Sequence, residues 1–282
     1  MARLLDTHQH LIYPEVAGYG WTADIPPLAD KAFPLERYKE LTKSEDIVGT
    51  LFMEAGVDDA DYKAETRFLA DLAKQDGSNI VGIIASCRPE DDDGYTDWLN
   101  ECDDLGVVGY RRILHVMPDE LSTTATFRKN VRALGDRGKT FDLCMLPKQL
   151  KLGADLARAC DNTTIVLNHC GVPDIAGGGL DPWRADMAAI AALPNVNCKL
   201  SGILAYCAPG EANEAAIRPF VDHVLDIFGP KRMVWGSDWP VVELANGLPH
   251  WLEVTDTILS ALSSDEASAI GQKNATRIYR LV

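Results

Sequence analysis

Short apolar runs recur along the chain, and most of them are rich in valine and isoleucine. Each run is short enough for a buried β-strand. The runs cover residues 4–5, 47–55, 80–86, 107–114, 140–146, 164–170, 196–202 and 233–239. The pattern therefore predicts eight strands.

Segments with helical periodicity separate these runs. The clearest has apolar residues at i, i+3, i+4, i+7, i+8 and i+11 over 217–228, and Gly229-Pro230 predicts its end. The segment 187–192, before Pro194, shows the same pattern. Phe68 and Leu72 are spaced i, i+4 and predict a further helix, for which Asp58 and Asp59 are the expected capping residues.

Alternation of continuous apolar strands with helices is typical of a parallel sheet covered on its outer face. Eight such strands close into a (β/α)8 TIM barrel, so we expect an α/β fold with one domain over residues 1–282. An open doubly wound sheet is the alternative. It is less well supported, because no GxGxxG motif follows the first strand.

Three long polar or proline-bearing segments interrupt this alternation. They cover residues 11–38, 171–183 and 205–213, and each follows a predicted strand. Loops that follow barrel strands lie at the carboxyl-terminal mouth, where active sites are built. We therefore expect these segments to form lids or pocket walls.

The charge of the chain narrows the choice of partner. With 42 acidic and 27 basic residues, the formal net charge is −15, which speaks against nucleic acid and anionic membranes and favours a small molecule. The seven cysteines include no CxxC pair and are expected to be reduced and buried. Neither an export signal nor a membrane span is evident, so we expect a cytoplasmic protein, and the sequence leaves open whether it is a homo-oligomer.

The segment Asp6-Thr7-His8-Gln9-His10 closes the first apolar run. On a regular strand Asp6, His8 and His10 project to one side, so two imidazoles converge. Such a pair is a common way to hold a divalent metal ion. The alternative is that the two histidines are ordinary polar residues near the N-terminus.

Polar residues end or follow nearly all of the predicted strands. Buried charged side chains rarely lack partners, so their repeated occurrence at one end of the strands predicts a shared site. These residues are His8, His10, Glu54, Arg88, Arg111, Arg112, His115, Asp142, His169, Lys199 and Asp238.

The motifs DTHQHL, GYRR, LNHCG, NCKLSG and WGSDWPV occur in this order and are followed by KNATRIYRL. Their combination resembles the amidohydrolase superfamily, specifically the amidohydrolase-2 branch that contains sugar-lactone hydrolases. The resemblance covers essentially the whole chain and implies a (β/α)8 barrel with His8, His10, His169 and Asp238 at the reacting centre. It implies opening of the lactone ring of an aldonic acid. Relatives with similar motifs open or isomerise dicarboxylate lactones, and some others decarboxylate.

The chemistry of lactone hydrolysis assigns further roles. Asp238 can accept a proton from water as general base, His169 can orient water or bind metal, and Arg111 can bind a carbonyl. Arg112 points away on a regular strand and is expected to pair with an acidic helix residue. Asp6 is expected to support a metal-binding histidine. The expected substrate-binding residues are Glu54, His115, Asp142, Lys199 and Trp239, with a structural ion pair as the alternative for Lys199.

The expected cofactor is one divalent metal ion, zinc, held by His8, His10, His169 and Asp238. Members of the amidohydrolase superfamily that bind two metal ions use a lysine on the fourth strand and a histidine on the fifth. By this resemblance, Arg111 and Asp142 occupy those positions here. Two metals are therefore not expected. Since some members of this branch work without metal, a metal-independent site is the alternative.

Overall fold

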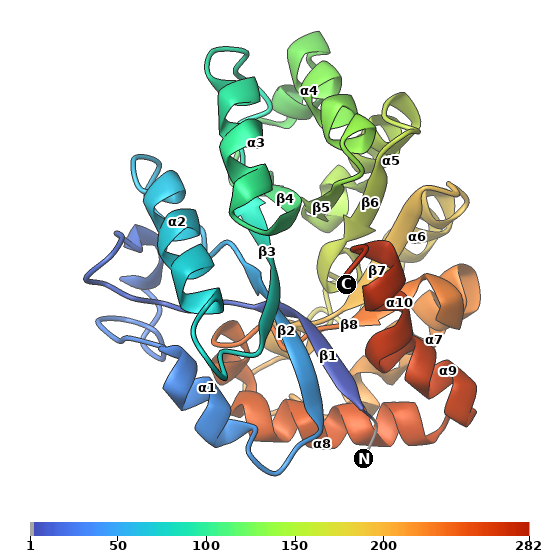
Figure 1. Cartoon of the computed structure of the whole chain (residues 1–282). Helices are drawn as coiled ribbons and strands as arrows, with labels where there is room; N and C mark the ends of the chain where they lie inside the picture. The colour runs from blue at the N-terminus through green and yellow to red at the C-terminus, as the bar shows by residue number, and fades with distance from the viewer. Residues whose placement is uncertain (1–2, 282) are drawn as a thin grey trace.

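Eight parallel strands form one sheet whose spatial order is their order in the sequence (Figure 1). The computed structural model describes residues 3–281. Hydrogen bonds of 2.8 Å from the Asp238 N–H to the His8 carbonyl and from the His10 N–H to the Trp239 carbonyl join the last strand to the first. The sheet thus closes, which confirms the (β/α)8 barrel. The strands are β1 Leu4–Gln9, β2 Ile47–Met53, β3 Ile80–Ser86, β4 Val107–Ile113, β5 Thr140–Cys144, β6 Thr164–Leu167, β7 Val196–Leu200 and β8 Met233–Trp235.

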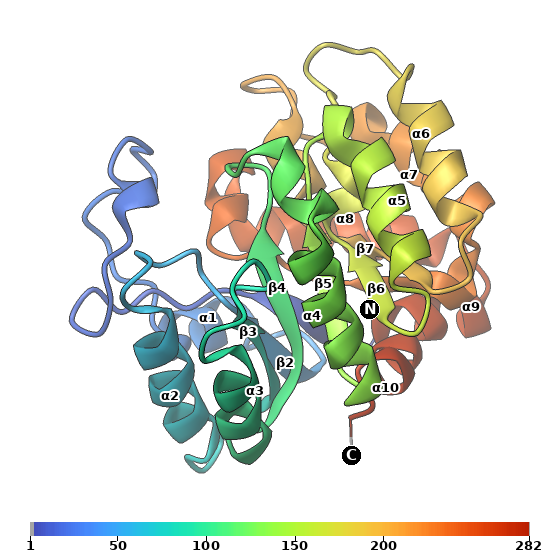
Figure 2. The same ribbon diagram turned by 90° about the horizontal axis from the view of Figure 1, so that it is seen from above.

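Helices surround the strands (Figures 1 and 2). They are α1 Leu35–Leu41, α2 Tyr62–Ala73, α3 Tyr95–Asp104, α4 Ala125–Asp136, α5 Leu150–Ala159, α6 Trp183–Ala191, α7 Glu214–Phe228, α8 Gly247–Ser260, α9 Ser264–Ser268 and α10 Asn274–Ile278. The helix predicted over 217–228 is α7, and it ends at Gly229 as expected. Asp58 and Asp59 do not cap α2, because Asp61 occupies the N-cap position.

The barrel interior is filled with side chains beneath the strand ends. Leu5, Leu51, Ile84 and Val166 pack there, and Tyr279 from the C-terminal segment joins them. This apolar packing closes the interior, so polar chemistry is concentrated at the other end, where the strands give way to loops.

Several strands end earlier than their apolar runs predict. β6, β7 and β8 stop at Leu167, Leu200 and Trp235, before the predicted ends at 170, 202 and 239. The chain leaves the strand direction at these points and turns across the barrel mouth. Hydrophobicity alone could not show this, because the turning residues are also buried.

The connection from residue 11 to residue 38 folds back against the end of β8. Ile12 and Phe33 form an antiparallel bridge. Phe33 and Tyr38 contact the Trp239 ring edge to face, with centroid distances of 5.5 and 5.6 Å. The aromatic residues thus fasten this segment to the mouth. Among residues 3–281, no helix has the length and apolarity that a membrane crossing requires.

Candidate active site

His8 and His10 converge on one carboxylate. The Nε2 atoms of His8 and His10 lie 3.5 and 3.4 Å from Oδ1 of Asp238. The pairing of β1 with β2 shifts register between Asp6 and Gln9, so regular alternation does not hold there. Asp6 consequently does not share the histidines' surroundings, contrary to the predicted common face.

Asp6 supports the site through the backbone. Its Oδ1 accepts hydrogen bonds from the N–H groups of His8 and Ser237 at 3.0 and 2.8 Å, and its Oδ2 accepts one from the Tyr38 hydroxyl at 2.7 Å. The predicted support of a histidine is therefore exerted on the His8 main chain and not on its ring. By accepting from the Ser237 N–H, the same carboxylate also holds the main chain one residue before Asp238.

Asp238 is the centre of the cluster. It is 2% exposed, and its Oδ1 has no hydrogen-bond partner among the described residues. Burial alone would raise its pKa, but His169, His10 and Arg111 outweigh that effect and lower the pKa. The carboxylate is therefore ionised at neutral pH and can accept a proton.

His169 reaches the same carboxylate from the end of β6. Its Nδ1 lies 3.7 Å from Oδ2 of Asp238, 3.0 Å from the Ser201 hydroxyl and 3.3 Å from the Ser201 carbonyl. Because the carbonyl can only accept, Nδ1 carries the proton and Nε2 presents a lone pair. Burial is the main cause that lowers the pKa of His169 to about 4, so the ring is neutral at neutral pH.

Arg111 and Glu54 form a buried pair beside the histidines. The Arg111 Nε donates to Oε1 of Glu54 at 2.5 Å, and its Nη1 lies 3.3 Å from Nε2 of His8. Burial opposes ionisation of Glu54, but Arg111 and the Gly56 N–H lower its pKa. Glu54 is thus engaged in orienting the guanidinium, and Arg111 projects toward the reacting centre.

The residues present fit one divalent metal ion. The His10 Nδ1 lies 2.9 Å from the Met53 carbonyl, so Nδ1 carries a proton and Nε2 faces the unpartnered Oδ1 of Asp238. Two facing acceptors require a cation, either a proton or a metal ion, between them. One ligand atom each from His8, His10 and Asp238 lies within 4.8 Å of the others. The 3.4 and 3.5 Å separations match the roughly 3.3 Å between ligands of a tetrahedral zinc ion with bonds of about 2 Å.

Two residues predicted to bind substrate lie deeper in the barrel. Asp142 and Lys199 are both 0% exposed and form an ion pair of 2.7 Å. The Lys199 ammonium also donates to the Thr7 carbonyl at 2.8 Å, while Asn168 and Tyr279 donate to Asp142. This is the structural ion pair that the sequence left as an alternative. Two residues further along β5, the Cys144 sulfur lies 3.2 Å from Nδ1 of His115.

Trp239 is also unavailable to substrate. Its side chain is 0% exposed, its Nε1–H donates to Glu243 at 3.0 Å, and its ring packs on Phe33 and Tyr38. The structure therefore assigns it to the attachment of the first long loop and not to substrate binding.

The remaining predicted residues lie around the mouth. His115 is exposed, and its Nδ1 lies 3.2 Å from the Cys144 sulfur. Arg88 pairs with Asp59 at 2.7 Å. Arg112 donates to Glu90 at 2.6 Å, so it points away from the site as alternation predicts, although Glu90 lies in a turn and not in a helix.

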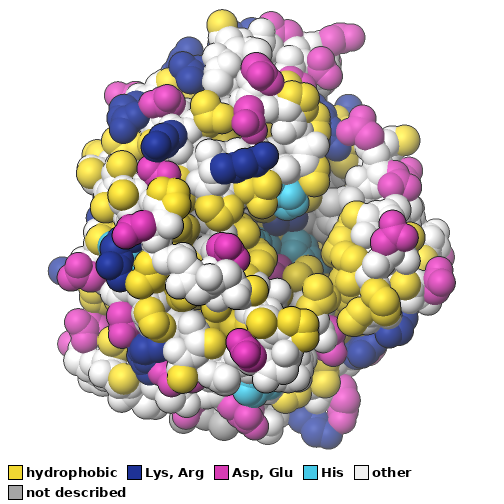
Figure 3. Space-filling model, turned by 180° about the vertical axis from the view of Figure 1, so that it is seen from behind, with side chains coloured by type: hydrophobic (Ala, Val, Ile, Leu, Met, Phe, Trp, Pro, Cys, Tyr) yellow, Lys and Arg dark blue, Asp and Glu magenta, His cyan; other side chains and the backbone are white. Residues whose placement is uncertain are grey.

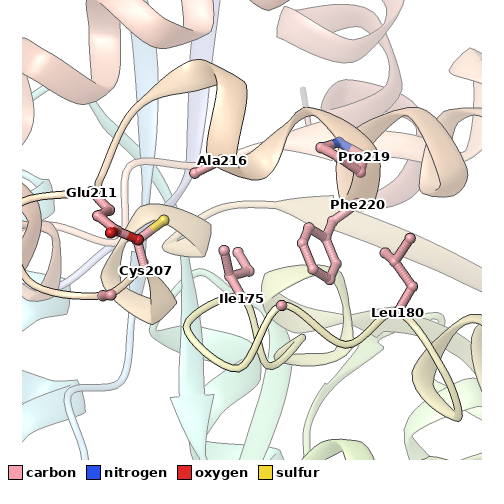
Figure 4. Close-up of a pocket in the computed structure, with 9 residues that line it drawn as sticks. Ile175, Leu180, Cys207, Glu211, Ala216, Pro219 and Phe220 are labelled. Atoms are coloured by element: carbon pink, nitrogen blue, oxygen red, sulfur yellow. The ribbon is translucent and has the colours of Figure 1, made fainter.

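One face of the molecular surface is hollowed. Figure 3 shows histidine side chains at the bottom of this hollow and a mostly hydrophobic rim around it. A separate cavity of about 290 Å³ lies between the loops after β6 and β7 and the start of α7 (Figure 4). Ile175, Cys207 and Phe220 contribute to its wall, but none of the cluster histidines does. The cavity is therefore a neighbour of the reacting centre and not part of it.

Sequence reasoning missed Tyr206. The residue lies in the short helical turn Ile203–Tyr206 after β7, and its ring centroid is 6.4 Å from that of His169. Its segment had been expected to form a pocket wall, but no spacing rule selects one tyrosine within an irregular loop.

An imidazole cluster around a carboxylate at the carboxyl ends of a (β/α)8 barrel is an arrangement typical of an enzyme active site. The amidohydrolase family model matches residues 5–281, and the chain belongs to that family. It is 28% identical to an L-fucono-1,5-lactonase of Burkholderia multivorans, covering 98% of this chain and 96% of the relative. It is 29% identical to an L-fucono-1,5-lactonase of Burkholderia ambifaria, covering 77% of this chain and 76% of the relative. The crystal structure of an amidohydrolase from Burkholderia multivorans with bound zinc superposes with a TM-score of 0.90, at 27% identity and full coverage of both chains.

Proposed function

We propose that this protein is a lactonase that opens the ring of a neutral, sugar-derived lactone, with Asp238 as general base. One observation carries the proposal. An ionised, buried carboxylate has an oxygen without a hydrogen-bond partner among residues 3–281 and lies 3.4 to 3.7 Å from nitrogen atoms of three imidazoles. The two L-fucono-1,5-lactonase relatives support the choice of substrate class.

The side chains divide the work of hydrolysis. Asp238 accepts a proton from the attacking water, and the proton-bearing Nδ1 of His169, 3.7 Å away, helps to keep the carboxylate ionised and oriented. The Arg111 guanidinium, held in place by Glu54, offers a charged donor to the lactone carbonyl oxygen, where negative charge develops.

We further propose zinc as the metal ion, held by His8, His10 and Asp238 with His169 beside them. When bound, a zinc ion polarises oxygen ligands and lowers the pKa of bound water. The zinc-containing Burkholderia structure supports this choice.

The charges around the mouth favour a neutral substrate over a dicarboxylate lactone or pyrone. A dicarboxylate would need several available arginines. Arg111 is assigned to the lactone carbonyl, and Arg112 and Arg88 are paired with Glu90 and Asp59 at 2.6 and 2.7 Å. Binding a second anion would require these pairs to open, which costs free energy that a neutral lactone does not require.

A panel of aldonolactones, assayed by proton release with and without a chelator, tests the proposal. We expect turnover of at least one lactone, and a fall in kcat of about 10² to 10⁴-fold in Asp238→Asn with little change in KM. Asp155→Asn, an exposed substitution on α5, is the matched control and should retain full activity.

Absence of turnover on the whole panel would contradict the lactonase assignment. Release of CO₂ from an aromatic carboxylic acid by the same preparation would replace it with a decarboxylase. An Asp238→Asn variant that turns over lactone at the parent rate would exclude this residue as the base.

A further inference from the structure

Trp21 differs from the other tryptophans of the chain in its exposure. Five of the six tryptophans are at most 3% exposed, whereas Trp21 is 37% exposed. It lies in the turn Gly20–Thr22 of the first long loop. A single exposed apolar side chain is ordinary on a protein surface, so the position of this indole decides what it can do.

The indole is anchored beside the residue that holds Arg111. The Trp21 Nε1–H donates to the Ala55 carbonyl at 2.8 Å. Ala55 follows Glu54, whose carboxylate and main-chain carbonyl both accept hydrogen bonds of 2.5 Å from the Arg111 guanidinium. The ring is therefore fixed close to the charged group that is assigned to the lactone carbonyl.

Gly56 places the indole at the ends of two strands. A Cβ atom on Gly56 would lie 3.6 Å from Nε1 of Trp21 and 3.1 Å from Cδ1 of Ile113, so the indole lies against a residue that has no side chain. Ile113 ends β4 and shares a strand face with Arg111, two residues earlier. The ring thus lies at the mouth of the barrel, where the segment after β2 meets the end of β4.

The loop that carries Trp21 is held by the segment that leads into α2. Gly18 N–H donates to Oδ2 of Asp61 at 2.9 Å, and Gly20 N–H donates to Oδ1 of Asp58 at 3.2 Å. The Asp58 N–H in turn donates to the Gly18 carbonyl at 2.9 Å. These bonds hold the main chain just before Trp21, so a ligand would not have to order the indole when it binds.

The proposed substrate can use such a surface. The hydroxyl and carbonyl groups of a neutral lactone need polar partners, but its ring carbons do not, and an indole offers a large, rigid apolar face. Figure 3 shows that hydrophobic side chains form most of the rim around the hollow. Resting on the lactonase function proposed above, we propose that Trp21 is a substrate-binding residue, whose exposed indole face contacts the ring carbons of the lactone while Arg111 holds its carbonyl oxygen.

Steady-state kinetics on an aldonolactone that the parent turns over test the contact. Trp21→Ala removes the indole face and should raise KM about 10-fold. Its kcat should stay within about fivefold, because Oε1 of Glu65 still accepts from the Ala55 N–H at 3.0 Å. Trp21→Phe keeps an aromatic face without the N–H, so its KM should stay within about threefold. Val81→Ala, an exposed apolar substitution near the start of β3 and away from the mouth, is the control and should match the parent.

The exposure of Trp21 supplies a second readout that does not depend on rate. Because the other five tryptophans are buried, acrylamide should quench chiefly Trp21, and Trp21→Phe should lose most of the quenchable emission. The same lactone in large excess over KM, read by stopped flow before it is consumed, should lower the quenching of the parent at least about twofold. It should leave the quenching of Trp21→Phe unchanged.

Three outcomes would overturn the inference. They are a KM of Trp21→Ala within about threefold of the parent, a quenching of Trp21 that the lactone does not change, and equal rises in KM in Trp21→Ala and Trp21→Phe. The last would assign the effect to the lost hydrogen bond with Ala55. If Trp21→Ala does not fold, quenching of the parent and of Trp21→Phe decides. A parent that turns over no lactone would contradict the proposed function itself, whereas an active parent with any of the three outcomes would contradict only this inference.

Discussion

At the scale of single residues, burial and nearby charge set which groups of the site are ionised. Burial keeps His169 neutral with a pKa of about 4, although Asp238 acts in the opposite direction. Asp238 is equally buried, but the surrounding histidines and Arg111 keep it ionised. Each member thus has the state that the proposed hydrolysis requires, a neutral imidazole beside a charged carboxylate.

Glu65 on α2 is a buried acid just outside this cluster. Its Oε1 accepts a hydrogen bond of 3.0 Å from the Ala55 N–H, and its Oε2 has no partner among the described residues. Burial, together with the negative charge of Glu54, raises the pKa of Glu65 well above its ordinary value. The folded protein therefore holds this proton more tightly than the unfolded chain does.

A pH dependence of stability follows. Because the pKa is raised in the folded state, the contribution of Glu65 is most favourable below about pH 4.5 and is lost as the pH rises toward the folded-state pKa. Glu65→Gln removes this titration, so its free energy of unfolding relative to the parent should increase between pH 5 and pH 9. Denaturant unfolding at several pH values measures the difference. Glu36→Gln, an exposed substitution on α1, should keep a constant difference, and a constant difference for Glu65→Gln would disprove the assignment.

At the scale of elements, the strand ends owe their shape to unusual backbone conformations. His169, Cys170 and Val172 have φ of 53°, 52° and 54°, and Asp238 has φ of 56°. For residues other than glycine this left-handed region is unfavourable by about 1 to 2 kcal/mol. Such conformations concentrate at functional sites, where they aim side chains that a straight strand would point elsewhere.

Gly202 shows how little space these turns leave. It has φ of 62°, and a Cβ atom placed on it would lie 2.1 Å from Oδ2 of Asp238 and 2.9 Å from Nδ1 of His169. Gly210, in the same loop, has φ of 80° but would have nothing within 4 Å of its Cβ. Comparing alanine substitutions at the two glycines therefore separates the cost of backbone strain from the effect of displacing Asp238 and His169.

Gly202→Ala should nearly abolish activity and destabilise the protein by more than Gly210→Ala, because only the first displaces Asp238 and His169. Gly210→Ala should carry the backbone cost alone, about 1 to 2 kcal/mol, and should retain its kcat. Steady-state kinetics and thermal unfolding of both variants measure these effects. Equal activity in the two variants would show that the packing around Gly202 is not critical.

At the scale of the whole molecule, barrel closure assembles the site. His8 lies on the first strand, His169 follows the sixth and Asp238 follows the eighth, so 230 positions separate the first and last of them. The hydrogen bonds between residues 8–10 and 238–239 bring these ends together. A ligand held by both ends should therefore stabilise the closed barrel.

Zinc binding should be visible without any activity measurement. A ligand that binds only the folded state raises the free energy of unfolding by about 2.7 kcal/mol at a concentration of 100 times its Kd. Zinc added to chelator-treated protein should therefore raise Tm, and this rise should be reduced in His10→Asn. His223→Asn on α7, whose ring lies against Trp183, should keep the full increase. An equal increase in all three proteins would place the bound zinc elsewhere.

The residue sequence by itself determined the barrel, the order of its strands and the cluster of His8, His10, His169 and Asp238. These features depend on local hydrophobic periodicity and on short motifs, which can be recognised from the order of the residues alone. The pairing of Arg112 away from the site was also predictable, because it follows from alternation along a regular strand.

Only the tertiary structure decided which polar residues reach the hollow. The register shift in β1 turns Asp6 toward the backbone, Lys199 and Asp142 neutralise each other inside the barrel, and Trp239 fastens a distant loop. Tyr206 lies on the site because two loops hold its turn against His169. These outcomes depend on contacts between residues far apart in the chain and on backbone turns with left-handed φ, and neither hydrophobic pattern nor spacing encodes them.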